Sequence, residues 1–562
     1  MFASLLSQGR LVSHERLWLA LFFALLIGLF IVLLPAPLLS LLGRSLEDRD
    51  GNFVGLANFE QYFASGALLR ALGNSLLVAA LSTLVVLSSA FAAAWALTRS
   101  LLPYRGWIRA ALLLPILAPS LLPAISLIYL FGEQGVLKAW LGDSSIYGPL
   151  GIVLGSCFWT FPHALMILLT AMSQADARHY EAAEVLGASS WRTFFTVTLP
   201  NARYGLVSAG FVVFILVFTD FGVPKVIGGQ FAMLATDVYK QVIGQQRFEM
   251  GAVVSVLLLL PALLAFMADR WVQGRQAATL TARAVPWRPK INRLRDLWAA
   301  TLLLPVLVFF AAVIGMAIYA SLVSYWPYNL TLSLNNYQFG RVIGDGWGSY
   351  FNSLQLAGLT MLAGTTLVFF NTWLSQRTPQ PRGLVALFQL LSLLPLAVPG
   401  MTLGLGYIFF FNHPNNPLNG LYGGMTILVL CTLTHFYSVP HLNLVTAFKQ
   451  LDSEFEAVGE SLRASRLQIL WRVSLPMSLP ALLDVALYFF VNAMTTVSAL
   501  VFLYGPHTNL AAISVLNLDD AGQTASAAAM AVCIMATCAL AKLLHGLLGA
   551  ALQRRQTIWR GA

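Results

Sequence analysis

Two short stretches, Val197-Thr198-Leu199-Pro200 and Val473-Ser474-Leu475-Pro476, decide how this chain is organised. Each one ends a polar segment that lies between two long apolar runs. The first polar segment contains Glu181-Ala182-Ala183 and Gly187, and the second contains the related Glu456-Ala457-Val458. A polar segment that occurs twice with the same ending indicates an internal duplication.

The composition is that of a membrane protein. Apolar residues make up 58% of the 562 residues and charged residues 10%, whereas about 25% of an ordinary soluble chain is charged. Apolar runs of about 20 residues, long enough to cross a bilayer as helices, recur along the whole length. The sequence therefore predicts an all-α polytopic protein with about twelve transmembrane helices. The expected spans are 17–40, 73–98, 107–131, 149–172, 204–224, 250–268, 297–322, 352–374, 384–411, 423–446, 478–503 and 525–550.

The spans fall into two halves. A basic segment, 271–296, separates a first unit at 1–270 from a second at 297–562, with six spans in each. Asn74-Ser75-Leu76 opens the second span, and Asn352-Ser353-Leu354 opens the eighth. Because six is even, both halves enter and leave the membrane on the same side, so the repeat is parallel and is expected to enclose a path between its halves.

Matched prolines interrupt one span in each half. Pro115 and Pro119 lie in the third span, and Pro395 and Pro399 lie in the ninth. Proline removes a backbone donor and clashes with the preceding turn, so both helices are expected to kink or break. Two interpretations remain open, a gate that faces the substrate and a static bend that shapes packing.

The basic excess is a signal of topology. The net charge is +10, and placing both termini in the cytoplasm puts most Lys and Arg residues in segments on the inner side, as the positive-inside rule predicts. The 271–296 segment is expected to set orientation and to attract anionic lipid headgroups. This distribution argues against nucleic acid as a partner.

The polar segments carry a resemblance to a known family. The first is similar, at every diagnostic position, to the cytoplasmic loop of the membrane-spanning permeases of bacterial ATP-binding-cassette importers of the binding-protein-dependent kind. The matching residues are Glu181, Ala182, Ala183, Gly187, Val197, Leu199 and Pro200. The resemblance implies the type I importer permease fold, with two permease subunits fused in one chain.

That resemblance implies a role for both loops. The segments at about 173–203 and 448–477 are expected to dock on a cytoplasmic dimer of ATP-binding-cassette ATPases and to couple it to the spans. The second copy departs from the pattern, because Arg463 replaces the glycine and Glu456 sits one place early. Its coupling residues are expected to be Glu456, Ala457, Leu475 and Pro476.

The first loop has the chemistry of a docking helix. Tyr180, Ala183 and Leu186 share one face of a short amphipathic helix that is expected to sit in a groove on the partner. Gly187 is expected to take the backbone conformation that ends the helix, and Glu181 to pair with a basic group or cap the segment. The alternative is a plain amphipathic connector without a partner.

The chain offers no chemistry of its own. No lysine lies in a G-x-x-x-x-G-K-[ST] loop, and neither paired catalytic residues nor a cluster with metal-ligand spacing emerges. We therefore expect a non-enzymatic subunit without a cofactor or metal, driven by a separate ATPase. The resemblance further implies a bacterial inner-membrane location, a periplasmic substrate-binding protein and one copy of this chain per complex.

Three substrates share this fused layout: ferric iron, thiamine and 2-aminoethylphosphonate. The stretch 218–224 resembles the whole group and does not choose among them. Segments 493–499 and 511–522 look closest to the aminoethylphosphonate permeases, so that substrate is the first expectation. Ferric iron and thiamine are the alternatives.

A few polar residues near the ends of the fifth and eleventh spans are candidates for the substrate path. Asp220 is a carboxylate at or within a span, which marks a functional candidate. It could attract an ammonium group or a cation, cap a neighbouring helix, or pair with Lys225. Hydroxyl groups near the same depth are those of Thr219, Thr495, Thr496 and Ser498, for which hydrogen bonding between helices is the structural alternative.

One rival architecture also fits twelve spans in two parallel halves, namely a secondary transporter of the major facilitator class. It predicts charged ion-coupling residues inside the spans and no docking loop. This chain has few charges within its spans and a well-matched loop, so the importer permease is the main expectation.

Overall fold

The computed structural model describes residues 2–173, 176–277, 287, 289, 291–342, 344–452, 454–462 and 464–560. Within these ranges, the side chains of 2–14, 16, 273–277, 456, 457, 460 and 553–560 are outside the description. Helices dominate the described residues, and the only strands among them are β1 (Val323–Tyr325) and β2 (Asn329–Leu332). These two pair antiparallel, with Val323 opposite Leu332 and Tyr325 opposite Asn329.

The expected number of membrane spans is confirmed. Among the described residues, nine helical segments are long and apolar enough to cross a membrane, and three bent helix pairs bring the number to twelve. The helices that form these spans are α1 (Phe2–Leu33), α2 (Pro35–Ser45), α4 (Ala67–Arg99), α5 (Arg105–Leu113), α6 (Leu121–Phe131), α8 (Pro149–Ser173), α11 (Leu199–Phe218), α14 (Phe248–Ala277), α15 (Arg293–Leu322), α16 (Gly348–Arg377), α17 (Arg382–Leu393), α18 (Gly400–Phe411), α19 (Met425–Phe436), α20 (Ser438–Gln450), α23 (Leu475–Thr495) and α25 (Thr524–Arg560).

Short elements connect or extend the spans. The α-helices among them are α3 (Ala57–Ala64), α7 (Lys138–Leu141), α9 (Ala177–Val185), α10 (Ser190–Thr193), α12 (Gly222–Ile227), α13 (Leu234–Tyr239), α21 (Glu454–Ser461), α22 (Arg466–Ile469) and α24 (Ala511–Asp520). The π-helical turns are η2 (Phe194–Thr198), η3 (Lys240–Gly244) and η8 (Leu470–Ser474). The 3-10 turns are η1 (Leu114–Leu117), η4 (Asn335–Tyr337), η5 (Phe339–Arg341), η6 (Leu394–Ala397) and η7 (Asn419–Leu421).

The prolines break the third and ninth spans, as expected. The chain bends by 101° between Arg105–Leu117 and Leu121–Phe131, and by 114° between Arg382–Ala397 and Gly400–Phe411. Pro119 and Pro399 lie at these two breaks, and Pro115 and Pro395 open the 3-10 turns that precede them. A third bend, of 56° between α19 and α20, was not anticipated from the sequence.

Two spans end earlier than the apolar pattern suggests. The fifth was expected to reach residue 224 and the eleventh residue 503, but α11 ends at Phe218 and α23 at Thr495. After α11 the chain turns into the separate helix α12, and after α23 it continues in turns over 498–503. Continuous hydrophobicity hid these ends, because buried turns are as apolar as the helices they follow.

The helices form two compact units whose composition crosses the sequence repeat. Unit 1 comprises Met1–Arg44, Gly348–Ala511 and Ala536–Ala562, and unit 2 comprises Ser45–Trp347 and Ala512–Met535. The expected units at 1–270 and 297–562 describe the sequence repeat and not these compact units, and they stay a prediction. Of the basic segment between the halves, residues 278–286, Arg288 and Lys290 lie outside the described part.

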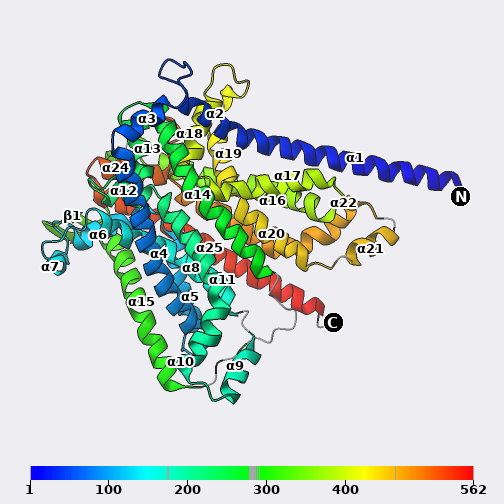
Figure 1. Cartoon of the computed structure of the whole chain (residues 1–562), viewed down its shortest axis with the longest axis horizontal. Helices are drawn as coiled ribbons and strands as arrows, with labels where there is room; N and C mark the ends of the chain where they lie inside the picture. Colours follow the sequence, from blue (N-terminus) through cyan, green and yellow to red (C-terminus); the bar gives the residue numbers. More distant parts are fainter. Residues whose placement is uncertain are drawn as a thin grey trace. The chain divides into compact units, whose positions relative to one another are not determined.

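The first helix of each repeat packs on the other repeat. In unit 1, α1 lies beside α17 (Figure 1), with the Phe23 ring centroid 5.2 Å from that of Phe388 and Phe30 4.3 Å from Tyr437. In unit 2, α15 packs against α4 and α6, and Phe310 lies 5.2 Å from the Phe158 ring of α8. Each unit therefore contains helices from both halves.

Candidate coupling site and substrate path

The first loop folds into a capped helix, α9. Asp176 precedes it in an extended conformation, and its Oδ1 accepts a hydrogen bond from the Arg178 backbone N–H at 3.0 Å. A side chain in this position satisfies one of the free N–H groups of the first turn. The loop is therefore a defined helix whose start is set by its own sequence.

Gly187 ends this helix as expected. Its φ is +67°, in the left-handed region, and the Ala188 N–H donates to the Ala183 carbonyl at 2.9 Å. This pattern is a common helix C-terminus, and glycine is favoured in it because a side chain there is strained. No atom lies within 4 Å of the place where a Cβ would stand.

The exposed face of α9 differs from the expected one. Ala183 is 8% exposed and Tyr180 is half-buried, so both face their own protein, and their expected contact with a partner stays a prediction. Glu181 and Ala182 are exposed, and they lie beside Val185 and Leu186, whose exposed fractions are 87% and 83%. The free surface of the loop thus carries apolar side chains beside two carboxylates, those of Glu181 and Glu184.

The loop leads directly into the fifth span. Ser189 caps α10 by accepting from the Arg192 N–H at 3.3 Å, and the π-helical turn η2 follows. Leu199 and Pro200 form the first turn of α11. Pro200 has no N–H to donate, and it directly follows the π-helical turn η2, where the register of the backbone hydrogen bonds changes.

The second loop repeats this backbone path. The Ala464 N–H donates to the Gly459 carbonyl at 2.9 Å after α21, as Ala188 does to Ala183. Ser465 then caps α22, η8 follows, and Leu475-Pro476 opens α23. Arg463 and the side chains of Glu456 and Ala457 lie outside the described residues. The structure thus repeats the segment more closely than the sequence does.

Asp220 has a structural partner. It is 8% exposed, and its two carboxylate oxygens accept backbone N–H bonds from Gly222 at 3.1 Å and Val223 at 3.3 Å. The carboxylate therefore caps α12, which was one of its alternatives. The alternative pairing with Lys225 is wrong, because Lys225 instead forms an ion pair with Asp520 at 3.0 Å.

The hydroxyl candidates are divided between the units. Thr219 belongs to unit 2, and Thr495, Thr496 and Ser498 belong to unit 1. Thr219 donates to the Ile215 carbonyl at 2.8 Å and Thr495 to the Val491 carbonyl at 2.9 Å, which are bonds within their own helices. Their place in a substrate path stays a prediction.

In each unit a close contact joins the broken span to the segment that follows the fifth or the eleventh span. In unit 1, a Cβ on Gly400 would stand 2.5 Å from the Ser498 hydroxyl oxygen. In unit 2, a Cβ on Gly222 would stand 2.4 Å from the Ser120 hydroxyl oxygen. The repeat aligns Ser120 with Gly400 and Gly222 with Ser498, so the glycine and the serine have exchanged places.

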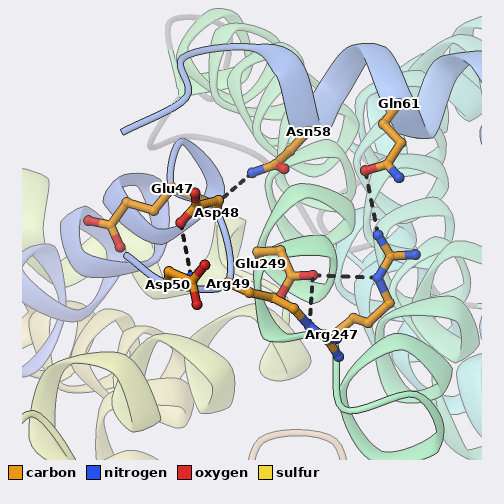
Figure 2. A network of polar contacts seen from close by, with 8 residues as sticks. All are labelled: Glu47, Asp48, Arg49, Asp50, Asn58, Gln61, Arg247 and Glu249. Atoms are coloured by element: carbon orange, nitrogen blue, oxygen red, sulfur yellow. Dashed lines mark hydrogen bonds and ion pairs between the residues drawn. The ribbon is translucent and has the colours of Figure 1, made fainter. Parts of the chain in front are cut away.

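A polar network fastens the 46–66 segment of unit 2 (Figure 2). The buried Glu249 at the start of α14 lies between two guanidinium groups, with Oε1 3.4 Å from Arg247 Nε and 3.9 Å from Arg49 Nε. Arg247 also reaches Gln61 of α3 at 3.5 Å. The network holds α3 and its loop against the N-terminal end of α14. No feature of the sequence pattern predicted this network.

Around Asp48 the same segment forms a tight turn. The Asp48 carboxylate accepts from the backbone N–H groups of Asp50 and Asn52 and from the Asn52 side chain. These bonds, led by that of the Asn52 side chain, hold the pKa of Asp48 below its ordinary value.

Among the described residues, no group of three His, Cys, Asp or Glu side chains could hold a metal ion.

A second polar cluster lies at the end of α24. Asp519 is next to the Lys225–Asp520 ion pair, and burial together with the charge of Asp520 raises the pKa of Asp519 to about 6, against the opposing effect of Lys225. Lys225 also lies over the Tyr239 ring, 5.3 Å from its centroid. The pair joins α12 to α24, two elements from different halves of the sequence within unit 2.

The twofold arrangement of loops and spans is matched by a known family. The family model of the binding-protein-dependent transport system inner membrane component matches residues 86–277 and again 381–554. The chain belongs to this family. The double match confirms that two permease domains are fused in one chain, and it makes the protein a non-catalytic, multi-pass component of an inner membrane importer. Membership implies an ATPase and a substrate-binding protein as partners.

Relatives match over most of the length. "Ferric transport system permease protein FbpB" of Actinobacillus pleuropneumoniae is 27% identical over 498 residues, covering 84% of this chain and 70% of the relative. "Putative ferric transport system permease protein FbpB 1" of Haemophilus influenzae is 28% identical over 480 residues, covering 82% and 74%. "Probable ABC transporter permease protein y4fN" of Sinorhizobium fredii is 24% identical over 507 residues, covering 86% and 88%.

These comparisons change the order of the expected substrates. The first expectation, 2-aminoethylphosphonate, finds no support in them, whereas the two ferric permeases match along both halves. That expectation rested on the likeness of segments 493–499 and 511–522, whereas the matches to the ferric permeases cover 84% and 82% of the chain. Family membership also displaces the secondary transporter.

Proposed function

We propose that this chain is the permease subunit of an ATP-driven ferric iron importer. The carrying observation is the match to two ferric transport permeases over 84% and 82% of the chain. In this role the chain carries no catalytic group, and its partners are a cytoplasmic ATPase dimer and a periplasmic iron-binding protein. One copy per complex supplies both permease domains, with both termini in the cytoplasm.

The loops at 176–200 and 454–476 are the proposed contacts with the ATPases. The exposed apolar residues Val185 and Leu186 beside Glu181 provide a surface that a soluble partner could cover. Each loop continues through a short capped helix and a π-helical turn into the fifth or eleventh span. Movement of a loop is therefore passed to a span through continuous helical structure, and ATP binding and hydrolysis would drive the spans between outward-open and inward-open states.

The test is uptake of radioactive ferric iron in a strain that lacks this gene and other ferric uptake systems. Restoring the gene together with its ATPase and binding protein is expected to restore uptake, and Glu181→Lys is expected to abolish most of it at an unchanged membrane level. Glu60→Lys makes the same charge change on the exposed helix α3 and is expected to leave uptake intact.

Two results would contradict different parts of this proposal. Equal iron uptake with and without the gene, with growth on 2-aminoethylphosphonate or uptake of thiamine dependent on it, would replace the substrate and keep the importer. Full uptake by Glu181→Lys would remove the coupling role of the first loop.

A further inference from the structure

Arg99 is a buried cation at the point where three helices of unit 2 end or begin. It is the last residue of α4 and is 5% exposed. One guanidinium nitrogen, Nη2, donates to the Met172 carbonyl near the end of α8 at 3.1 Å and to the Tyr180 hydroxyl of α9 at 3.1 Å. The coupling helix is thus tied to the second and fourth spans through one side chain.

Aromatic rings complete the surroundings of this guanidinium. Its carbon lies 4.8 Å from the centroid of Tyr180 and 4.8 Å from that of Trp287, and the two rings are 5.5 Å apart. The partners that hold the charge here are a carbonyl, a phenol and two ring faces. A planar guanidinium suits such a site, whereas the ammonium of lysine does not stack on rings in the same way.

Tyr180 passes the connection on to the fifth span. Its hydroxyl accepts from Arg99 and donates to the Thr198 Oγ1 at 3.2 Å. Thr198 is 5% exposed and ends η2, immediately before Leu199 opens α11. A continuous chain of polar contacts therefore runs from α4 through α9 to α11.

The other half has an arginine at the corresponding place. Arg377 ends α16 at the position of Arg99, and its guanidinium donates to the carbonyls of Phe448 and of Leu451, the latter at 2.8 Å. Its α21 loop, Glu454–Ser461, contains no tyrosine. Arg377 therefore joins the ends of α16 and α20. The second loop is also tied to α16, because the Arg466 guanidinium of α22 donates to the Arg377 carbonyl at 3.2 Å.

We propose that Arg99, Tyr180 and Thr198 form a positioning junction that transmits movement of α9 to α4 and α11. The proposal rests on the docking role proposed for α9. It assigns Arg99 and Thr198, which lie outside the expected coupling residues, to the coupling mechanism.

The experiment follows movement directly in the complex of this chain with its ATPases. Asn201→Cys places a thiol on the exposed surface at the start of α11, and its labelling rate is measured with and without a nonhydrolysable ATP analogue. The analogue is expected to change the labelling rate of this thiol in the parent protein. Tyr180→Phe, Thr198→Val and Arg99→Lys are expected to reduce that change roughly threefold to tenfold, the order of effect for one lost hydrogen bond.

Matched variants separate transmission from structure. Thr198→Ser keeps the hydroxyl and is expected to behave as the parent. The double variant Tyr180→Phe/Thr198→Val is expected to be no worse than Tyr180→Phe alone, because that single change already removes the bond to Thr198. Arg377→Lys is expected to leave the α11 response unchanged. In transport assays the junction variants are expected to lower the maximal rate while the KM for loaded binding protein stays constant.

The outcomes distinguish this proposal from the one it rests on. An unchanged labelling response in Tyr180→Phe and Thr198→Val, with the ATPases still bound, would overturn the junction while leaving docking in place. Loss of ATPase binding in Glu181→Lys would support the docking role of α9 independently. ATPase binding that persists in Glu181→Lys would contradict that docking role, on which the junction rests. The labelling response does not depend on which substrate is carried.

Discussion

At the residue scale, the side chains of the first loop determine which surface is buried and which is exposed, and the backbone conformation of Gly187 determines where the helix ends. Tyr180 and Ala183 face inward, whereas Glu181, Ala182 and Val185 are exposed on the surface proposed for the ATPase. Gly187 contributes neither contact nor bulk, since open space surrounds it. What it supplies is a φ of +67°, which lets the helix end and the chain reverse towards α10.

This predicts opposite effects for one substitution at two glycines. Gly187→Ala places a side chain in a left-handed conformation, which costs about 1–2 kcal/mol, so uptake and thermal stability are expected to fall. Gly106→Ala lies in the first turn of α5, also with open space around it but without a positive φ, and is expected to be neutral or slightly stabilising.

Gly187→Asn provides the conservative control, because asparagine tolerates the left-handed region. It is expected to retain most uptake. Equal losses in Gly187→Ala and Gly106→Ala, measured at equal membrane levels, would show that backbone conformation is not what position 187 supplies.

At the element scale, the broken spans depend on close packing as well as on proline. Pro119 and Pro399 prevent a continuous helix, but they do not decide what packs at the break. Ser120 meets Gly222 in unit 2, and Gly400 meets Ser498 in unit 1. Each half places one glycine against one serine at this contact, and the two residues have exchanged positions between the halves. Close packing at the break therefore depends on the combined size of the two residues and not on which position holds the glycine.

The exchange predicts a rescue. Gly222→Ala would put a methyl group 2.4 Å from the Ser120 hydroxyl oxygen, and overpacking of this kind costs about 1–3 kcal/mol. The melting temperature of the purified protein is therefore expected to fall. Adding Ser120→Gly removes the clashing hydroxyl and is expected to restore most of the loss. A double variant as unstable as Gly222→Ala alone would show that another contact is responsible.

At the scale of the whole molecule, neither sequence half contains a complete unit. The first half supplies α1 to unit 1, and the second supplies α15 to unit 2. The aromatic contacts of Phe23 and Phe30 with Phe388 and Tyr437, and of Phe310 with Phe158, are all contacts between halves. Segment 512–535 also belongs to unit 2, where Asp520 pairs with Lys225.

A chain cut within residues 278–286 is therefore expected to reassemble. Co-expressed fragments, each ending or starting in this segment, should co-purify and support uptake, because the packing between halves does not require a covalent link. Either fragment alone is expected to be degraded or inactive. Stable, separately purified fragments that fail to associate would contradict the exchange of first helices.

The sequence by itself determined the class of protein, the number of spans, the repeat and the two proline breaks. These features follow from local properties, since hydrophobic length sets a span and a missing N–H stops a helix. Asp220 was correctly marked as notable, but the sequence left its role among several alternatives.

Only the tertiary structure decided which residues meet. The Asp220 carboxylate accepts from N–H groups of α12, and Lys225 forms an ion pair with Asp520. Tyr180 faces inward and accepts a hydrogen bond from Arg99. Helix α1 belongs to the unit that contains most of the second half, and α15 to the unit that contains most of the first half. Such choices depend on contacts between residues far apart in the chain, and an apolar helix in lipid carries almost no sequence signal of which neighbour it will pack against.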